Sequence, residues 1–402
     1  MKKICIVAEC MYCGGVEKSL LSLLSYLDRS KYKITLLLLQ KKGDLLPQLP
    51  KDIDVLEMDL PDSERDDLLY GRGTALKNAL KTGHWLRAFG KICRALYMRL
   101  FVKDGAARRV WYYKRIDKKI KAFPGEFDVA IDYMGYGLFN TFYAAKKVKA
   151  NVKLSWVHFE PEQALPDFYE LEELLLSYQH IMCVSENNKQ QTVQMMPSLK
   201  ERCKVFYNII DTESLYKQAE QASMEKNEKE IALLSIGRLD PQKGFDLGIK
   251  VAENLYTAGY PIKYYIIGDG WCRSQLEMQI AQSKAAENCV TLLGKQLNPY
   301  PYIKACDIYF QPSRHEGFGI AVAEARAFCK PIVVTDFAGA REQLKDGQTG
   351  LIVPCDIDAM TTAVRTLLDN GDLMDTFKTN LSDELGKFTA QLNVLYDIFD
   401  HA

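Results

Sequence analysis

Short apolar runs alternate with helical segments along the chain, in two successive series. In the first series, strands are expected near 3–8, 33–39, 53–57, 127–131, 152–157 and 180–184, with helices such as 16–27 and 168–178 between them. In the second series, strands are expected near 231–236, 262–267, 289–293, 307–310, 331–335 and 350–353. Continuous apolar runs are typical of parallel strands buried on both faces, and parallel strands need crossover helices. The sequence therefore predicts an α/β protein with two Rossmann-like, doubly wound parallel-sheet domains.

The length of 402 residues suits two domains of about 200 residues each. The polar stretch 211–229 marks the expected boundary, so we expect domains over 1–210 and 211–382. A hydrophobic content of 48% and a charged content of 26% are typical of a soluble globular protein, and no apolar run approaches the about 18 residues of a spanning helix. Eleven cysteines, mostly inside apolar runs, favour a reduced, cytoplasmic setting, and the isolated pair Cys10 and Cys13 is not expected to bind metal.

Seven residues separate Glu316 from Glu324, in a loop that leads into a predicted helix over 320–328. Gly317 and Gly319 let the backbone approach a ligand closely, and the helix start offers free N–H groups and a positive dipole end to a phosphate. A carboxylate only accepts hydrogen bonds, so its natural partners are sugar hydroxyls or a ribose diol. The spacing alone suits equally well a capping acid followed by an ordinary surface glutamate.

A second loop adds two cations. Arg238 and Lys243 flank a tight turn after the predicted strand 231–236, at the end of a parallel strand where open α/β sheets bind ligands. The guanidinium of Arg can donate two parallel hydrogen bonds to two phosphate oxygens, whereas the ammonium of Lys acts as a point charge. With the two glutamates, these cations suit a nucleoside diphosphate-sugar, although exposed cations on a solvated loop would give the same local pattern.

These segments, in this order, resemble the C-terminal domain of the family 4 retaining glycosyltransferases, which have the GT-B fold. The matching pieces are GRLDPQKG (237–244), YYIIGDG (264–270), VTLLG (290–294), QPSRHEGFGIAVAEARA (311–327), KPIVVTD (330–336) and QTGLIVP (348–354). Weaker matches in the first half are CGGVEKSLLSLL (13–24), LSWVHFE (154–160), CVSENNK (183–189) and VFYNIID (205–211). The resemblance implies that the C-terminal helical run 383–402 crosses back onto the first domain.

The resemblance also implies roles for individual residues. Arg238 and Lys243 would hold the donor diphosphate, Glu316 would face the donor sugar and Glu324 the ribose. His158 would reach the sugar from the first domain. The remaining substrate-binding positions would be the first-domain loop at Gly14 and Gly15 and the donor-site positions Gly317, Phe318, Gly319, Ile320, Gly268 and Gly294.

Four other acidic residues compete with these assignments. Glu160 and Glu162 follow His158 in the same loop and are alternative acids, ranked lower. Asp356 and Asp358 resemble the metal-binding Asp-x-Asp of a different glycosyltransferase fold, but they open a predicted helix, so capping explains them better. No metal and no cofactor is therefore expected.

A basic segment interrupts the first series at 72–121, where fifteen Lys or Arg residues stand against Asp104 and Asp117. Apolar residues recur there at helical spacing: Trp85, Leu86, Phe89, Ile92, Cys93, Leu96, Tyr97, Leu100 and Phe101. The cations Arg87, Lys91, Arg94 and Arg99 border or oppose this apolar stripe. Such a helix suits the surface of an anionic membrane, or else packs its stripe on the domain core. No groove-reading motif accompanies the charge, so nucleic acid is not an expected partner.

Together these features predict a metal-independent retaining hexosyltransferase that acts on a nucleotide-sugar, UDP by default, and on a glycan or lipid-linked acceptor. Such an enzyme would serve cell-surface polysaccharide synthesis at the inner face of the plasma membrane. The alternatives are an inactive transferase-like subunit that supports a partner enzyme, a sugar-nucleotide epimerase and a glucan synthase of the same fold.

Overall fold

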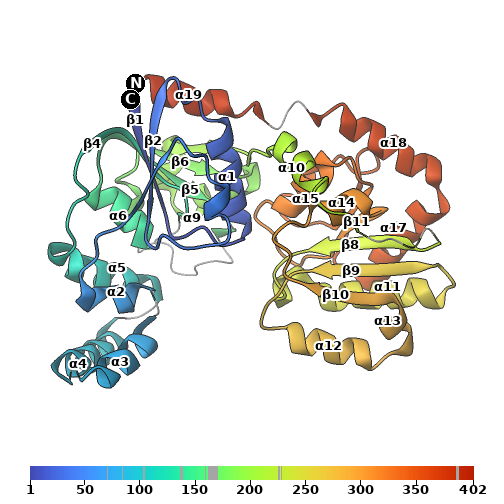
Figure 1. Cartoon of the computed structure of the whole chain (residues 1–402), viewed down its shortest axis with the longest axis horizontal. Helices are drawn as coiled ribbons and strands as arrows, with labels where there is room; N and C mark the ends of the chain where they lie inside the picture. Colours follow the sequence, from blue (N-terminus) through green and yellow to red (C-terminus); the bar gives the residue numbers. More distant parts are fainter. Residues whose placement is uncertain are drawn as a thin grey trace.

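Two parallel β-sheets, each covered by helices, form the two halves of the molecule in the computed structural model (Figure 1). The structure describes residues 1–402 except 70, 84, 103–104, 136–138, 159, 162–170, 225–226, 228 and 386–388. The expected fold class is confirmed, because both sheets are wholly parallel and both reverse their strand order part-way across.

The first sheet has seven strands in the order β3-β2-β1-β4-β5-β6-β7. Its strands are β1 (Lys2–Ala8), β2 (Tyr32–Leu38), β3 (Asp54–Glu57), β4 (Glu126–Asp132), β5 (Lys149–Val157), β6 (His180–Cys183) and β7 (Cys203–Val205). Ile6 of β1 lies between Leu36 of β2 and Ile131 of β4. The strand β7 was not expected, because a three-residue strand leaves too short an apolar run to be recognised in the sequence.

The second sheet has six strands in the order β10-β9-β8-β11-β12-β13. Its strands are β8 (Ile231–Ile236), β9 (Ile262–Ile267), β10 (Val290–Gly294), β11 (Ile308–Gln311), β12 (Ile332–Thr335) and β13 (Leu351–Val353). All six lie within one residue of the expected positions. The agreement is close because each strand is a compact apolar run buried between helices on both faces.

Helices around the first sheet are α1 (Gly15–Tyr26), α2 (Asp62–Leu69), α3 (Gly71–Lys81), α4 (Trp85–Phe101), α5 (Gly105–Ile116), α6 (Phe139–Lys147), α8 (Glu172–Leu175) and α9 (Glu186–Met195). Those of the second half are α10 (Thr212–Ala219), α11 (Phe245–Thr257), α12 (Arg273–Ala281), α13 (Lys284–Cys289), α14 (Tyr300–Ala305), α15 (Ile320–Ala327), α16 (Ala340–Gln343), α17 (Ile357–Asp369) and α18 (Gly371–Ser382). Short 3₁₀ turns occur at Leu46–Gln48, Asp117–Lys119, Pro197–Arg202 and Pro241–Lys243. Of the expected helix 168–178, residues 168–170 lie outside the described part and α8 covers the rest only in part.

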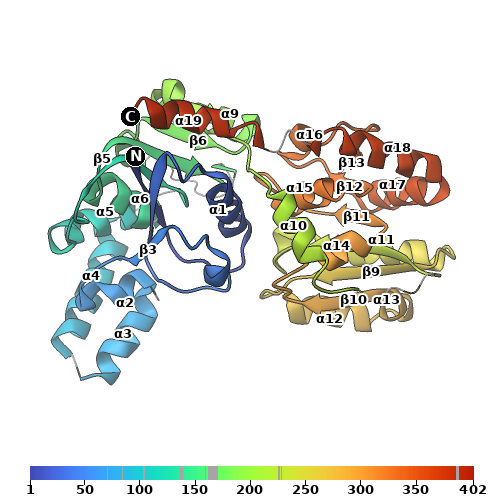
Figure 2. The same ribbon diagram turned by 45° about the horizontal axis from the view of Figure 1, so that its top comes forward.

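The last helix, α19 (Leu392–Asp400), lies against the first sheet, although α18 before it belongs to the second half (Figure 2). Tyr396 stacks on Tyr32 with ring centroids 5.6 Å apart. Lys2 Nζ donates to the carbonyl of Asp400 at 2.9 Å. The chain end is thereby fastened beside β1 and β2.

Helices α2, α3 and α4 form a helical lobe (residues 62–101 apart from 70 and 84), and α3 and α4 project from the first domain away from the second (Figures 1 and 2). The apolar stripe of α4 lies on the surface of this lobe, with Leu86 90% exposed and Phe101 70% exposed. The alternative that α4 packs its apolar stripe on the core of the first domain is therefore wrong for the described residues. The side of α4 that faces inward carries Ala88 and Met98 instead.

Two of the cations expected to face a membrane turn inward. Lys91 Nζ lies 2.8 Å from Asp67 Oδ2 of α2, and Arg94 pairs with the same carboxylate. These ion pairs hold α4 on α2, so Lys91 and Arg94 do not belong to the outer face of the lobe. Arg99 is exposed as expected, whereas the side chain of Arg87 lies outside the described residues. The sequence could not show this because the acids on α2 lie some 25 positions upstream.

Candidate active site

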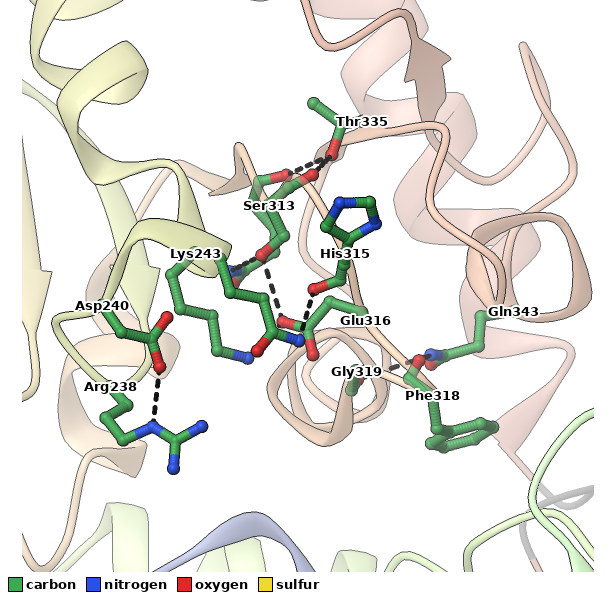
Figure 3. Close-up of polar contacts among 12 residues, drawn as sticks. Arg238, Asp240, Lys243, Ser313, His315, Glu316, Phe318, Gly319, Thr335 and Gln343 are labelled. Carbon is green, nitrogen blue, oxygen red and sulfur yellow. Dashed lines mark hydrogen bonds and ion pairs between the residues drawn. The ribbon is translucent and has the colours of Figure 1, made fainter. Parts of the chain in front are cut away.

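The second sheet reverses its strand order between β8 and β11, and the two loops singled out in the sequence follow these two strands. Loop 237–244 follows β8 and loop 312–319 follows β11, so both leave the carboxyl edge of the sheet at the reversal (Figure 3). Open α/β sheets bind ligands at this point, because neighbouring loops diverge there and leave a crevice. Gly244 is required in the first loop, since its φ of +65° and the nearby carbonyl of Pro312 leave no room for a side chain.

Lys243 and Glu316 come together across the two loops. Lys243 Nζ pairs with Glu316 Oε1, and Ser313 Oγ donates to the same oxygen at 3.1 Å. Figure 3 shows Lys243, Ser313 and Glu316 together. Gln311 in turn donates to Ser313 Oγ at 2.8 Å, which fixes the serine. A carboxylate held in this way is a directed hydrogen-bond acceptor, and an ammonium beside it supplies positive charge to an anionic ligand.

Arg238 lies on the same loop as Lys243 and is exposed. Its Nε donates to Asp240 Oδ2 at 2.7 Å, while 69% of its side chain is exposed. An exposed ion pair of this kind contributes at most about 1 kcal/mol, so the guanidinium can turn toward a bound phosphate at small cost. Arg238 and Lys243 thus lie on the same loop, with the side chain of Arg238 69% exposed and that of Lys243 17% exposed.

The helix α15 starts directly after the loop 312–319. Gly319 precedes it with a φ of +82°, a conformation that favours glycine, and the carbonyl of Phe318 accepts a hydrogen bond from Gln343 Nε2. The buried ring of Phe318 anchors the loop, and Ile320 begins the helix beside Gly317–Gly319. The Val322 and Ala323 N–H groups donate to the carbonyl of Gly319. The N–H groups at the very start of a helix have no intrahelical acceptor, so the start of α15 is a candidate anion-binding position.

The loop of the first domain that precedes α1 lies close to the start of α15. A Cβ atom added to Gly15 would lie 3.5 Å from Ile320 of α15, so the two loops face each other closely. Gly14 precedes α1 with extended backbone, and a Cβ there would lie 2.4 Å from Glu17 Oε2. The structure therefore brings the expected first-domain loop against the expected donor loop.

Glu324 lies one turn into α15 and is only 3% exposed. Its Oε1 accepts from Lys18 Nζ of α1 at 3.0 Å and from the hydroxyl of Tyr300 at 3.0 Å. Lys18 also lies over the Tyr300 ring, 4.8 Å from its centroid. Burial disfavours the ammonium, but Glu324 and its neighbours outweigh this and raise the pKa of Lys18 above its usual range. Sequence analysis missed Lys18 and Tyr300, although Lys18 stands within the matched segment 13–24.

His158 follows β5 at the carboxyl edge of the first sheet. Its Nε2 lies 2.8 Å from the carbonyl oxygen of Tyr133, which follows β4, and its ring lies 4.9 Å from the Tyr133 ring. Burial lowers the pKa of His158 to about 4, although the backbone hydrogen bond acts in the opposite direction. The imidazole is therefore neutral at physiological pH and keeps one donor and one acceptor nitrogen.

Two glycines complete the second-domain edge. Gly268 has a φ of +152° and lies so close to Gly237 that an added Cβ would meet the Gly237 carbonyl at 1.8 Å. Its N–H donates to the carbonyl of Gly294 at 3.0 Å, and Gly294 has a φ of +73°. The loops after β8, β9 and β10 are thus packed against one another at Gly237, Gly268 and Gly294.

Of the competing acids, Glu160 lies beside the loop 312–319, and Asp356 and Asp358 lie at the start of α17. Glu160 lies 3.8 Å from His315 of the second domain, whereas Glu162 lies outside the described residues. Asp356 caps α17 by accepting from the Ala359 N–H at 2.9 Å, as capping requires, and Asp358 is exposed. Across the described ranges no group of three or more His, Cys, Asp or Glu side chains is arranged to hold a metal ion.

Comparison with known proteins gives a family match for part of the chain. Residues 217–383 match the model of the glycosyl transferases group 1. This region contains Arg238, Lys243, Glu316 and Glu324. The resemblance of the second domain to glycosyltransferases is therefore supported, whereas its assignment to the retaining family 4 stays a prediction.

Two curated relatives match about half of the chain or less. The N-acetylgalactosamine-N,N'-diacetylbacillosaminyl-diphospho-undecaprenol 4-alpha-N-acetylgalactosaminyltransferase of Campylobacter jejuni is 32% identical over 197 residues, which cover 48% of this chain and 52% of the relative. The alpha-D-kanosaminyltransferase of Streptomyces kanamyceticus is 30% identical over 151 residues, covering 37% of this chain and 39% of the relative. The chain thus spans about half or less of the length of these relatives.

Solved structures resemble the whole chain. The structure of Anabaena HepE in complex with UDP and glucose superposes with a TM-score of 0.69 at 17% identity, covering 100% of both chains. At this identity the similarity establishes the shared fold of two parallel-sheet domains. No described helix is both long and apolar enough to cross a membrane.

Proposed function

We propose that this protein is a glycosyltransferase that moves a sugar from a nucleoside diphosphate-sugar, with UDP the nucleotide we favour, to a hydroxyl of a lipid-linked or other glycan acceptor. The observation that carries the proposal is the Lys243–Glu316 pair beside the start of α15 at the strand-order reversal of the second sheet. This arrangement offers cations and free N–H groups to a diphosphate and a directed carboxylate to a sugar. The match of residues 217–383 to the glycosyl transferases group 1 and the complex of HepE with UDP and glucose support it.

Each residue has a defined task in this proposal. Arg238 and Lys243 bind the diphosphate, and with the N–H groups at the start of α15 they stabilise the charge that develops on it as it leaves. Glu316 exchanges its contact with Lys243 for a hydroxyl of the donor sugar. Neutral His158 hydrogen-bonds the sugar from the first domain. No step requires a metal ion, because these groups supply the positive charge.

The reaction balances without a cofactor. The bond between the sugar carbon C1 and the diphosphate oxygen breaks, the acceptor oxygen bonds to C1, and the hydroxyl proton leaves with the nucleoside diphosphate. We propose retention of configuration, in keeping with the family 4 resemblance. Glu316 Oε1 accepts hydrogen bonds from Lys243 and Ser313. We assign none of the described residues as a covalent nucleophile.

We further propose that the protein works on the cytoplasmic surface of an anionic membrane, in cell-surface polysaccharide synthesis. The support is the exposed stripe of α4 and the exposed cations Lys77, Lys81 and Arg99 on the same lobe. An amphipathic helix binds such a surface by burying its apolar face and placing its cations near the lipid headgroups. The Campylobacter jejuni relative, whose name states a diphospho-undecaprenol substrate, is consistent with a lipid-linked acceptor.

The enzymatic proposal is tested with a panel of nucleotide-sugars. A true donor at 100 times its dissociation constant should stabilise the protein by about 2.7 kcal/mol, and slow hydrolysis should release the nucleoside diphosphate. Glu324→Ala should weaken UDP binding roughly 10- to 150-fold if the ribose reaches this carboxylate, whereas Glu316→Ala should impair transfer with UDP binding nearly intact. Stabilisation without any donor turnover would instead favour the inactive-subunit alternative, and release of an altered nucleotide-sugar would favour an epimerase.

The membrane proposal has its own test, in flotation with vesicles. Leu86→Ser with Phe101→Ser removes exposed apolar area, and Lys77→Glu with Arg99→Glu reverses exposed charge, while both leave the α2–α4 ion pairs intact. Each pair of changes should release the protein from vesicles that contain anionic lipid, and added salt should do the same. Equal binding to neutral vesicles would contradict the role of charge. Lys91 and Arg94 are unsuitable for this test, because reversing them would place like charges beside Asp67.

A further inference from the structure

The short helix α16 holds the donor loop, residues 317–319, in place. Gln343, the last residue of α16, is buried, and its Nε2 donates to the carbonyl of Phe318 (Figure 3). The residue before α16 packs on the same loop, because a Cβ atom added to Gly339 would lie 3.0 Å from the Phe318 carbonyl oxygen. The conformation of the donor loop therefore depends on the position of α16.

Glu342 of α16 reaches across to the first domain and caps α9. Its Oε2 accepts from the N–H of Glu186 at 2.7 Å, and its Oε1 accepts from the N–H of Asn187 at 3.1 Å. The N-cap residue Ser185 accepts from the next N–H group, that of Asn188. A carboxylate at a helix start satisfies free N–H groups and is favoured by the helix dipole. The cap of α9 is thus shared between the two domains.

Tyr207, which follows β7 in the first domain, contacts both α16 and the donor loop. Burial raises the pKa of Tyr207 above its usual range, and the charge of Glu342 and its hydrogen bond with the Tyr207 hydroxyl act in the same direction. The ring of Tyr207 lies beside the ring of Phe318, with the centroids 6.4 Å apart. The first domain therefore contacts the donor loop directly through Tyr207 and indirectly through Glu342.

We infer that Glu342 is a positioning residue that couples the start of α9 to the conformation of the donor loop. The inference rests on the proposed function only in so far as that function gives the donor loop its ligand. Glu342 and Gln343 are neighbours in a helix of four residues, so a force on one is transmitted to the other. The contact of α9 with Glu342 thus helps to hold the Phe318 carbonyl and, with it, the start of α15.

The cap is unusual in its origin. A helix start is ordinarily capped by a side chain of its own segment, as Ser185 does here for one N–H group. Because Glu342 lies in the other domain, its hydrogen bonds to Glu186 and Asn187 form only when the two domains are in contact. The donor loop is therefore fully supported only in that arrangement.

Hydrogen exchange measured by mass spectrometry in peptides that cover α15 tests the coupling, because the N–H groups of Val322 and Ala323 donate to the carbonyl of Gly319. In Glu342→Ala these amides should exchange faster, and UDP binding should weaken about tenfold. Arg341→Ala is the matched control, because Arg341 lies on the same helix, is 62% exposed and pairs within its own domain. It should exchange and bind UDP like the wild type.

A second variant changes the coupling from the first domain. Glu186→Pro removes the N–H group that Glu342 accepts at 2.7 Å, and proline is well tolerated at the first position of a helix. Ser185 already has extended backbone, as the residue before a proline requires, so α9 should still form. This change should also speed exchange in α15 of the other domain and weaken UDP binding.

Unchanged exchange in α15 in either folded variant would overturn the inference. So would an equal increase in Arg341→Ala, because it would show a general loosening of α16 rather than a role of Glu342. If Glu342→Ala fails to fold, Glu186→Pro decides alone, since it leaves the second domain unaltered. Exchange is measured without any nucleotide, so it does not depend on activity. A wild-type protein that binds no nucleotide-sugar and transfers no sugar would refute the proposed function and leave the coupling standing.

Discussion

The contact of Lys18 with Glu324 offers the sharpest measurement of how the two domains are joined. The two groups come from α1 of the first domain and α15 of the second, and their side chains are 15% and 3% exposed. At 3.0 Å and an effective dielectric constant of about 20, the Coulomb attraction is roughly 5 kcal/mol before desolvation is subtracted. Replacing one partner leaves the other charge buried and unpaired, which typically costs 3–5 kcal/mol. We therefore expect Lys18→Met to destabilise the protein by about 3 kcal/mol.

A double-mutant cycle separates the pair from its surroundings. Lys18→Met, Glu324→Gln and the double variant are each unfolded in urea and followed by tryptophan fluorescence. The Tyr300 hydroxyl can still donate to the amide oxygen of a glutamine, so Glu324→Gln removes the charge with little change in shape. The coupling energy should be about 2–3 kcal/mol, and the double variant should be more stable than the sum of the single changes implies. A coupling below about 1 kcal/mol, the value of exposed pairs, would show that the pair does not fasten the domains.

Three further outcomes follow from the site. Burial lowers the pKa of His158 to about 4, so between pH 4 and 6.5 the unfolded chain binds more protons than the folded protein. As the pH falls through this window, His158 should lower the free energy of unfolding by up to about 3 kcal/mol. Burial raises the pKa of Asp132 to about 6, so this group changes the stability in the opposite direction. The free energy of unfolding is therefore compared between the wild type and His158→Asn over this pH range, and parallel pH profiles would contradict the prediction for His158. Gly268→Ala should destabilise the second domain by more than 1 kcal/mol and weaken UDP binding, because the new methyl group meets the Gly237 carbonyl, and a normal melting temperature would refute this. Transfer should survive excess EDTA, and loss of activity restored by manganese would reopen Asp356 and Asp358 as metal ligands.

Local sequence could predict much of the fold, and in the candidate site it could predict the proximity of Lys243 and Glu316. Apolar runs separated by amphipathic segments specify parallel strands and crossover helices, because a strand buried on both faces needs a continuous apolar sequence. The proximity of Lys243 and Glu316 could be predicted, because each belongs to a loop that follows a strand and the carboxyl ends of parallel strands lie at the same edge of the sheet. The strand β7 escaped this reasoning because three residues carry too little periodic signal.

Only the tertiary structure decided which groups meet across long stretches of sequence. Glu324 faces Lys18, 306 positions away, because α1 of the first domain packs against α15 of the second. The apolar stripe of α4 shows the limit most clearly. Helical periodicity fixes which side chains share a face, but whether that face meets the core or the solvent depends on the ion pairs that hold its opposite side to α2.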